Sequence, residues 1–168
     1  MEKYIYSFNE IINDKIDPAE ILGNKGSGLN LMTNLGLPVP QGFTISTRVN
    51  HYYQKNNSLP EDFKKELDKN IIYLEELSNP RLGSSKNPLL LSVRSGSQKS
   101  MPGMLDTILN IGFNKEVLIY FVDQDKALFA WDTWRRFLHM FSHVVFKIEH
   151  FYFDEILDSY LLGCLLYT

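Results

Sequence analysis

Glycine and proline residues interrupt this sequence at several points, and these interruptions limit what the chain can fold into. Gly36, followed by Pro38 and Pro40, ends a helical spacing of apolar residues, because glycine often follows a helix and proline cannot continue one. The Asn79-Pro80 pair ends a second periodic segment in the same way. The chain is therefore expected to form several short helices and strands.

The spacing of apolar residues between these interruptions predicts the type of each element. Strands are expected over residues 4–8, 43–47, 88–94 and 107–111, and helices over residues 29–35, 48–54, 60–78 and 127–146. Thr47 is expected to cap the second helix, Pro60 to lie in the first turn of the third, and residues 88–94 to form a buried strand. This order predicts a mixed α/β (α+β) domain over residues 1–158.

The helix expected over residues 127–146 is apolar on more than one side, which indicates a buried element. Several of its large side chains are expected in the core rather than at a cofactor: Phe129, Trp131, Trp134, Phe137, Leu138 and Phe141. Asp132 is expected to pair with Arg135 and Arg136 in a structural ion-pair network.

Charge and cysteine content exclude several classes of function. The formal net charge of −3 gives no general reason to expect nucleic acid or a membrane as partner, so any anion site must be local. The single cysteine, Cys164, cannot form an intramolecular disulfide, and it favours a reducing, cytoplasmic location. The N-terminus lacks the pattern of a signal peptide, and the apolar C-terminal residues are too few to span a bilayer.

The stretch SVRSGSQKSMPGMLDT, residues 92–107, places a cation where a strand ends and small residues begin. Glycine lets backbone N–H groups approach an oxygen ligand, and the guanidinium of Arg94 can bind phosphate through two parallel hydrogen bonds. Lys99 adds a second cation. The alternative is a flexible hairpin loop whose arginine pairs with a surface carboxylate.

A second stretch, LGNKGSGLNLM, has the same combination of a cation and glycines. Lys25 is expected to precede or open a helix, where a positive side chain is unfavourable by up to about 1 kcal/mol unless an anion binds there. The alternative is a solvated lysine in a turn. Neither stretch is a P-loop or a dinucleotide fingerprint, because the Gly-Lys-Ser/Thr order and a third glycine are missing. Two such loops could together hold one polyphosphate.

His139 and His143 lie four residues apart on the expected helix, a spacing that can hold zinc. The sequence shows no third ligand beside them. Histidines of the core or the surface are the alternative, and no metal ligand is expected in this chain.

Three motifs in this order resemble the N-terminal nucleotide-binding domain of the pyruvate, phosphate dikinase family. They are GNKGSGLNLMTNLGLPVPQGFTIST, SVRSGSQKSMPGMLDTILNIGFN and FAWDTWRRFLHMFSHVV, and the resemblance covers about residues 4–158. It implies the N-terminal part of an ATP-grasp-type domain that transfers a phosphoryl group from ATP to a histidine of a separate domain. That phosphohistidine then serves pyruvate, so that pyruvate, ATP and phosphate become phosphoenolpyruvate, AMP and diphosphate.

The resemblance also implies which residues contact the ATP phosphates. Lys25 and Arg94 match the family's two cations, and the segment from Ser100 to Thr107 matches its glycine-rich loop. The residues expected to bind phosphate are Lys25, Arg94, Gly96, Ser100, Met101, Gly103, Met104, Asp106 and Thr107. Such chemistry depends mostly on positioning and charge neutralisation, so no nucleophile is needed here.

The family's phosphohistidine motif and pyruvate-binding barrel do not occur in this sequence, so no catalytic residue is expected. The Mg²⁺ that accompanies ATP is expected to have its ligands in the part that this chain lacks. Residues 159–168 are expected to be an aberrant apolar tail, from a premature or frame-shifted end. Three hypotheses stay open: an ATP-binding piece that is inactive alone, a non-catalytic remnant that acts only with the remaining dikinase domains on a separate chain, and a helical interaction module.

Overall fold

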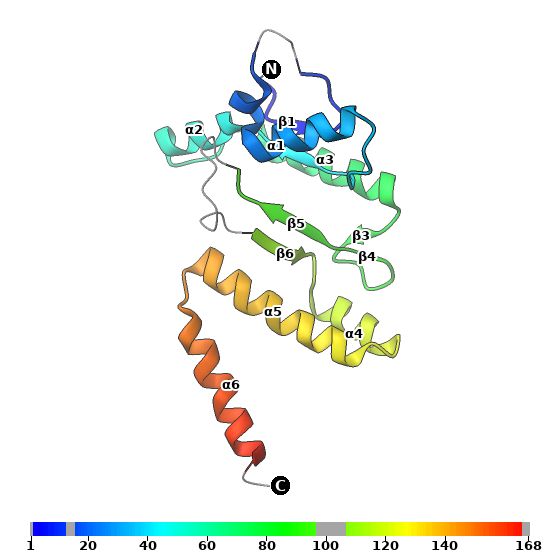
Figure 1. Ribbon diagram of the computed structural model, residues 1–168, viewed down its shortest axis with the longest axis vertical. Helices are drawn as coiled ribbons and strands as arrows, with labels where there is room; N and C mark the ends of the chain where they lie inside the picture. The colour runs from blue at the N-terminus through cyan, green and yellow to red at the C-terminus, as the bar shows by residue number, and fades with distance from the viewer. Residues whose placement is uncertain (1, 13–15, 97–106, 166–168) are drawn as a thin grey trace. The chain divides into compact units, whose positions relative to one another are not determined.

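The computed structural model describes the backbone of residues 2–12, 16–96 and 107–165, with side chains up to residue 160 (Figure 1). The chain divides into two compact units. The first unit contains the described residues up to Pro80, together with Ser95 and Gly96, and the second contains Arg81–Arg94 and the described residues from Thr107 onward. Each unit is described here by itself.

The first unit joins a two-stranded sheet to three helices. Its elements are β1 (Ile5–Ser7), α1 (Pro18–Asn34), β2 (Phe43–Ile45), α2 (Thr47–Asn56) and α3 (Phe63–Ser78). β1 and β2 pair antiparallel, with Ile5 opposite Ile45 and Ser7 opposite Phe43. All five elements overlap segments that the sequence predicts, although α1 begins well before the predicted start.

The core of the first unit lies where β1, α2 and α3 meet. Ile5, Val49 and Phe63 are buried together, and Tyr4, Phe43 and Leu67 pack against them. Glu66 of α3 also holds β1 from outside this cluster, since its carboxylate accepts hydrogen bonds from the backbone N–H groups of Tyr4 and Ile5.

Two helix starts differ from the sequence prediction. Ser46, not Thr47, caps α2, because the Ser46 side chain accepts a hydrogen bond from the backbone N–H of Arg48. The hydroxyl of Thr47 instead donates to the carbonyl of Glu20, 2.5 Å away. Pro60 does not lie in the first turn of α3: it precedes Phe63 in a turn, and its carbonyl accepts from the N–H of Phe63. Ser46 and Thr47 are both suitable capping residues, and the bond of Thr47 to Glu20 leaves Ser46 as the cap of α2.

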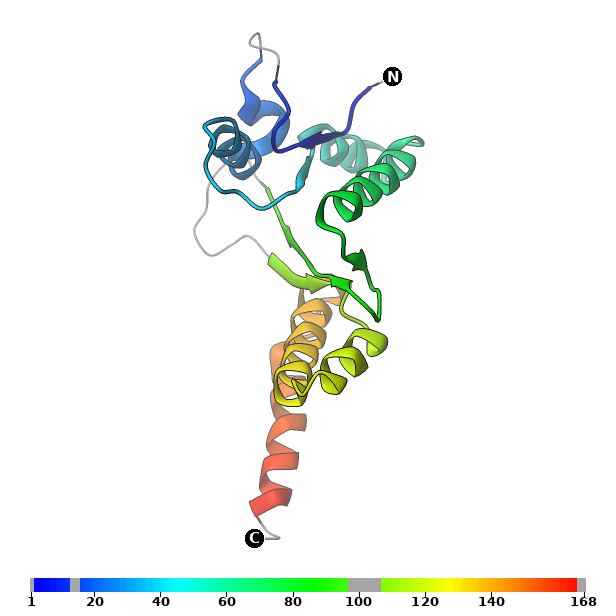
Figure 2. The same cartoon turned by 90° about the vertical axis from the view of Figure 1, so that its right-hand side faces the viewer.

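The second unit places a strand hairpin beside two packed helices. Its elements are β3 (Arg81–Leu82), β4 (Pro88–Leu89), β5 (Leu91–Arg94), β6 (Thr107–Ile111), α4 (Lys115–Asp123), α5 (Ala127–Phe146) and α6 (His150–Leu165). β3 and β4 form a short parallel pair, and β5 and β6 pair antiparallel. α5 packs against both β6 and α4, and α6 leaves the end of α5 and extends away from the hairpin (Figures 1 and 2).

An aromatic cluster between α4 and α5 forms the core of the second unit. Its buried residues are Phe113, Val117, Leu118 and Ala130, and Leu90, Phe121, Val122, Trp134 and Phe137 pack against them. The predicted core role is therefore confirmed for Trp134 and Phe137. It is wrong for Phe129 and Trp131, whose exposed fractions are 54% and 58%, and Leu138 is also exposed. The long helix buries one face, and its apolar residues extend beyond that face.

The segment of residues 88–94 is extended as predicted, but it is not a buried strand. Val93 is half exposed, and the residues on either side of it are exposed too. Among the described residues, β5 pairs with β6 alone, so no further strand covers it. The apolar run indicated the extended conformation correctly and the burial wrongly.

The described residues thus form a mixed structure of helices and small sheets, as the sequence predicts. α6 passes through the domain boundary predicted at residue 158 without a break, and that boundary stays a prediction. No described helix combines the length and apolar character that a membrane crossing requires.

Candidate functional site

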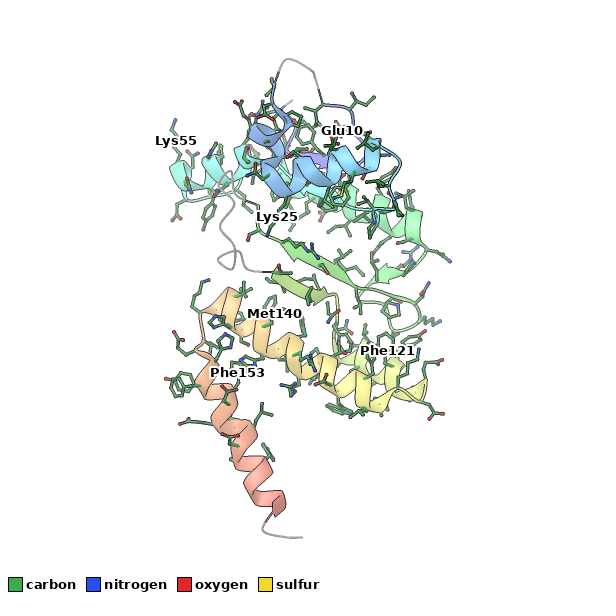
Figure 3. The ribbon with its side chains drawn as sticks, viewed as in Figure 1. Glu10, Lys25, Lys55, Phe121, Met140 and Phe153 are labelled. Carbon is green, nitrogen blue, oxygen red and sulfur yellow. The ribbon has the colours of Figure 1, made fainter. Side chains whose placement is uncertain are left out.

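Lys25 lies just after a sharp break in α1. Gly23 has φ 70° and ψ 169°, so α1 consists of two helical parts that meet there. This conformation is open to glycine and costly for other residues. Lys25 therefore stands in the first turn of the second part, where backbone N–H groups lack helical partners, and it is exposed (Figure 3). The prediction that Lys25 opens a helix is confirmed.

The first part of α1 was missed from the sequence, although a signal for it exists. Asp17 caps this part through a hydrogen bond from the N–H of Ala19, and Pro18 occupies the first helical position. An acidic residue followed by proline is a common helix start. Gly23 and Gly26 made this stretch look like a loop in the sequence. In the structure Gly23 forms a kink within α1 instead.

Contacts with the residues that follow β1 and with β2 fix the second part of α1. The buried side chain of Asn30 donates hydrogen bonds to the carbonyls of Phe8 and Glu10, at 2.9 and 2.7 Å. A Cβ at Gly26 would stand 2.7 Å from Thr44 Cγ2, so this glycine allows α1 to approach β2 closely. Gly26 is thus explained by packing, and not by the approach of a ligand.

Gly28 and Gly96 differ from Gly26 in this respect. A Cβ at Gly28 would meet no atom within 4 Å, and one at Gly96 would meet the carbonyl oxygen of Leu22 at an ordinary 3.8 Å. Neither position therefore needs glycine for the packing of the described residues.

The β5–β6 hairpin brings together two of the residues predicted to bind phosphate. Arg94 is the last residue of β5, Thr107 is the first of β6, and they are partners in the strand register. Both therefore stand at the end of the hairpin from which the connecting residues leave, and Arg94 is exposed there. The prediction that residues 107–111 pair with the strand ending at Arg94 is confirmed.

The other predicted loop residues lie outside the described part of the chain. These are Ser100, Met101, Gly103, Met104 and Asp106, together with Lys99. Lys25 belongs to the first unit and Arg94 to the second, so the structure describes each of these two cations within its own unit.

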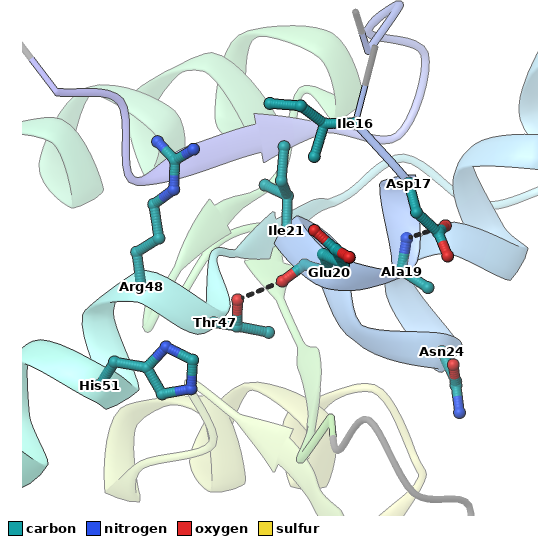
Figure 4. Close-up of a pocket in the computed structure, with 9 residues that line it drawn as sticks. All are labelled: Ile16, Asp17, Ala19, Glu20, Ile21, Asn24, Thr47, Arg48 and His51. Carbon is teal, nitrogen blue, oxygen red and sulfur yellow. Dashed lines mark hydrogen bonds between the residues drawn. The ribbon is translucent and has the colours of Figure 1, made fainter. Parts of the chain in front are cut away.

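A pocket that the sequence did not indicate lies beside the kinked helix in the first unit (Figure 4). It is open, with a volume of about 620 Å³. Its lining comes from the residues that lead into α1, from α1 on both sides of its kink, and from the first half of α2: Ile16, Asp17, Ala19, Glu20, Ile21, Asn24, Thr47, Arg48 and His51. The hydrogen bond from Thr47 to the carbonyl of Glu20, two residues of this lining, joins α2 to α1. Asp17 and Glu20 are acidic and Arg48 is basic, so the pocket can contact positive or negative groups of a ligand.

The ion pairs predicted around Asp132 are confirmed. Its carboxylate lies 2.9 Å from the Arg135 guanidinium and 2.8 Å from that of Arg136. Hydrogen bonds from Arg135 and then Arg136 lower the pKa of Asp132 from its ordinary value. All three side chains are on one exposed side of α5, which fits the structural role expected for them.

Comparison with known proteins gives one consistent result. Residues 19–81 match the family described as "Pyruvate phosphate dikinase, AMP/ATP-binding domain". The pyruvate, phosphate dikinase of Rickettsia conorii is 47% identical over 164 residues, which are 95% of this chain and 19% of that protein. This chain is similar to pyruvate, phosphate dikinases over nearly all of its length. The relative from Rhizobium meliloti is 42% identical over 162 residues, covering 95% of this chain and 18% of that dikinase.

The chloroplastic dikinase of Flaveria trinervia is also similar, with 46% identity over 144 residues, which are 85% of this chain and 15% of that protein. The resemblance inferred from the three motifs is therefore confirmed. This chain spans about a fifth of the length of the curated dikinases that it matches. The match to the AMP/ATP-binding domain includes Lys25, and the longer alignments with whole dikinases extend over nearly all of the chain.

Proposed function

We propose that this chain is the part of a pyruvate, phosphate dikinase that binds the phosphates of ATP, within a nucleotide-binding domain of the ATP-grasp type. Lys25 and Arg94 would neutralise phosphate charge, and backbone N–H groups near Gly96 and in the segment from Ser100 to Thr107 would bind phosphate oxygens. The observation that carries this proposal is the position of Lys25. It is exposed in the first turn after the Gly23 kink, within the stretch that matches an AMP/ATP-binding domain.

The β5–β6 hairpin supports the proposed role of Arg94. A cation at the last residue of a strand, opposite Thr107, stands where the predicted glycine-rich loop leaves and returns. Rigid strands on both sides of a loop limit where its ends can move, and this favours a fixed phosphate site. We propose that Arg94 binds phosphate from the base of this loop.

The complete reaction is proposed for the chain only in combination with the rest of a dikinase. There, a phosphoryl group would pass from ATP to a histidine of another domain and then serve pyruvate, giving phosphoenolpyruvate, AMP and diphosphate. Mg²⁺ would accompany ATP, with ligands in that remaining part. The partner would be the remaining dikinase domains, and a cytoplasmic location stays the expectation from the single cysteine.

Thermal unfolding with and without ATP and magnesium tests phosphate binding. A ligand that binds only the folded state stabilises it by about 2.7 kcal/mol at a hundredfold excess over the dissociation constant. We expect ATP to raise the melting temperature of the parent chain, and Lys25→Ala and Arg94→Ala to remove most of that increase. Lys64→Ala in α3 and Arg81→Ala in β3 remove equivalent charges elsewhere and should leave it unchanged.

Two results would contradict the proposal. A cooperative transition that ATP does not shift would mean that the chain is a remnant that does not bind the nucleotide. Equal loss of the ATP effect in the control variants would mean that net charge, and not the two named cations, governs binding.

A further inference from the structure

Three histidines of the second unit meet where α5 turns into α6. His139 Nε2 and His150 Nδ1 are 2.6 Å apart, within hydrogen-bond distance. The rings of His143 and His150 stack with their centroids 3.7 Å apart. The proposed phosphate site does not use these residues, although His139 and His143 lie within the third motif of the family resemblance.

Helix geometry and one turn bring the three rings together. His139 and His143 are four residues apart, so they lie on the same face of α5. Lys147 then adopts a left-handed conformation with φ 57°, which ends α5, and His150 is the first residue of α6. His143 Nδ1 lies 3.0 Å from the carbonyl oxygen of Ile148, so its N–H can donate across the turn.

The contact between α5 and α6 depends strongly on this cluster. His139 also stacks on Phe153 of α6, with ring centroids 4.5 Å apart, and Figure 3 shows Phe153 near the start of that helix. On either side of Phe153, Tyr152, Ile156 and Tyr160 of α6 are exposed. Among the side chains of α6 that the structure describes, up to residue 160, none is buried. The ring contacts of His139 and His143 join this part of α6 to α5.

The His139–His150 hydrogen bond requires at least one neutral ring. A neutral imidazole has one donor and one acceptor, whereas an imidazolium has two donors and no acceptor. If both rings carry a proton on each nitrogen, two N–H groups face each other and two positive charges lie side by side. The His139–His150 pair therefore holds α6 when both rings are neutral, and it repels α6 when both rings are charged.

The surroundings of His139 favour its neutral form. Burial, the largest cause, and then the neighbouring His150 lower the pKa of His139. Arg135 and His143 of α5 act in the same direction, while Asp154 of α6 opposes them. Since the folded-state pKa is depressed, its contribution to stability is present above the unfolded pKa of about 6.5 and is lost as the pH falls through the folded value.

We propose that His139, His143 and His150 form a proton-operated latch, which holds α6 against α5 when the rings are neutral and releases it when they are protonated. Two unit charges at the 4.7 Å separation of the His139 and His150 ring centroids weaken the docking equilibrium about fourfold even in a water-like dielectric. His143, stacked on His150, adds to the repulsion when it is charged. Release frees the end of α5 and changes the surface that this corner presents.

A metal-linked corner is the competing explanation, because imidazoles are common zinc ligands. In the described residues, however, no three His, Cys, Asp or Glu side chains are arranged to hold a metal ion. The close His139–His150 contact also fits a shared proton better, since two ligands around a tetrahedral metal at about 2.0–2.1 Å stand farther apart than 2.6 Å.

Hydrogen exchange of the α6 amides tests the latch. Protection factors are measured on the whole chain at pH 7.5 and pH 5, corrected for the intrinsic exchange rate, with and without EDTA. We expect protection of the first turns of α6 to fall about fourfold or more at pH 5 in the parent. In His150→Gln, whose side chain does not titrate, the pH dependence should be lost. His51→Gln in α2 is the matched control and should behave as the parent.

The ring titrations supply a measurement that needs no variant. Nuclear magnetic resonance of the histidine rings should show His139 titrating over the pH range in which α6 loses protection. If α6 does not dock in His150→Gln at pH 7.5, the test rests on the parent chain. There, the His139 titration and the loss of α6 protection should occur over the same pH range. Asp154→Asn should move the release to lower pH, because it removes the carboxylate that favours charged His139.

Four results would overturn the latch. α6 protection could be the same at both pH values in the parent, or the pH dependence could persist in a folded His150→Gln. EDTA could loosen α6 at pH 7.5, which would assign the corner to a metal. Loss of protection that does not coincide with a ring titration would also exclude it.

Discussion

Single residues in α1 show how one sequence pattern can have two physical causes. Gly23, Gly26 and Gly28 surround Lys25 and look alike in the sequence. Gly23 makes a kink through a positive φ, Gly26 permits close contact with Thr44, and Gly28 meets no neighbouring atom. The sequence predicted correctly that a helical part begins near Lys25, and it missed the part of α1 before Gly23. It could not separate the three glycines, because their roles depend on β2, which is distant in the sequence.

Alanine at two of these positions should therefore have opposite effects on stability. Gly26→Ala should lower the free energy of unfolding by about 1–3 kcal/mol, because its Cβ would overlap Thr44. Gly28→Ala should raise it by about 0.5–1 kcal/mol, since alanine is favoured inside a helix and no atom obstructs it. Urea denaturation of both variants measures the difference, and equal effects would contradict the contact with Thr44.

Elements were predicted more reliably than their surroundings. The strands at residues 5–7 and 43–45, the hairpin of β5 with β6 and the long helix α5 all follow from apolar periodicity and from turn residues. Burial was predicted less well, as Val93 and Trp131 show, because it depends on which elements lie next to each other. The anchoring of β1 by Glu66 was not predictable either, since the two are about sixty residues apart in the sequence.

Glu66 provides a test at the scale of elements. Glu66→Ala should destabilise the first unit by about 1–3 kcal/mol, because the N–H groups of Tyr4 and Ile5 lose their acceptor. Glu76→Ala, an exposed position on the same helix, is the control and should change stability little. Hydrogen exchange of the Ile5 amide locates the effect. An unchanged exchange rate there in Glu66→Ala would show that Glu66 does not hold β1.

At the scale of the whole molecule, the resemblance to the pyruvate, phosphate dikinases follows from motifs that are spread along the chain, and the comparisons confirm it. The phosphate-binding role remains a proposal for two exposed cations, each at the end of a helical or strand element in its own unit. The sequence could not predict how three histidines meet at the α5–α6 corner. His150 joins the pair on α5 only because Lys147 turns the chain.

The measurement that tests the central claim most directly is competition for ATP binding by parts of the nucleotide. Titration calorimetry with ATP is repeated in the presence of inorganic triphosphate or of adenosine, for the parent and for Arg94→Ala. If Lys25 and Arg94 bind phosphate, triphosphate should displace ATP, adenosine should displace little, and Arg94→Ala should weaken ATP and triphosphate by the same factor. Displacement by adenosine but not by triphosphate would contradict a phosphate site in this chain.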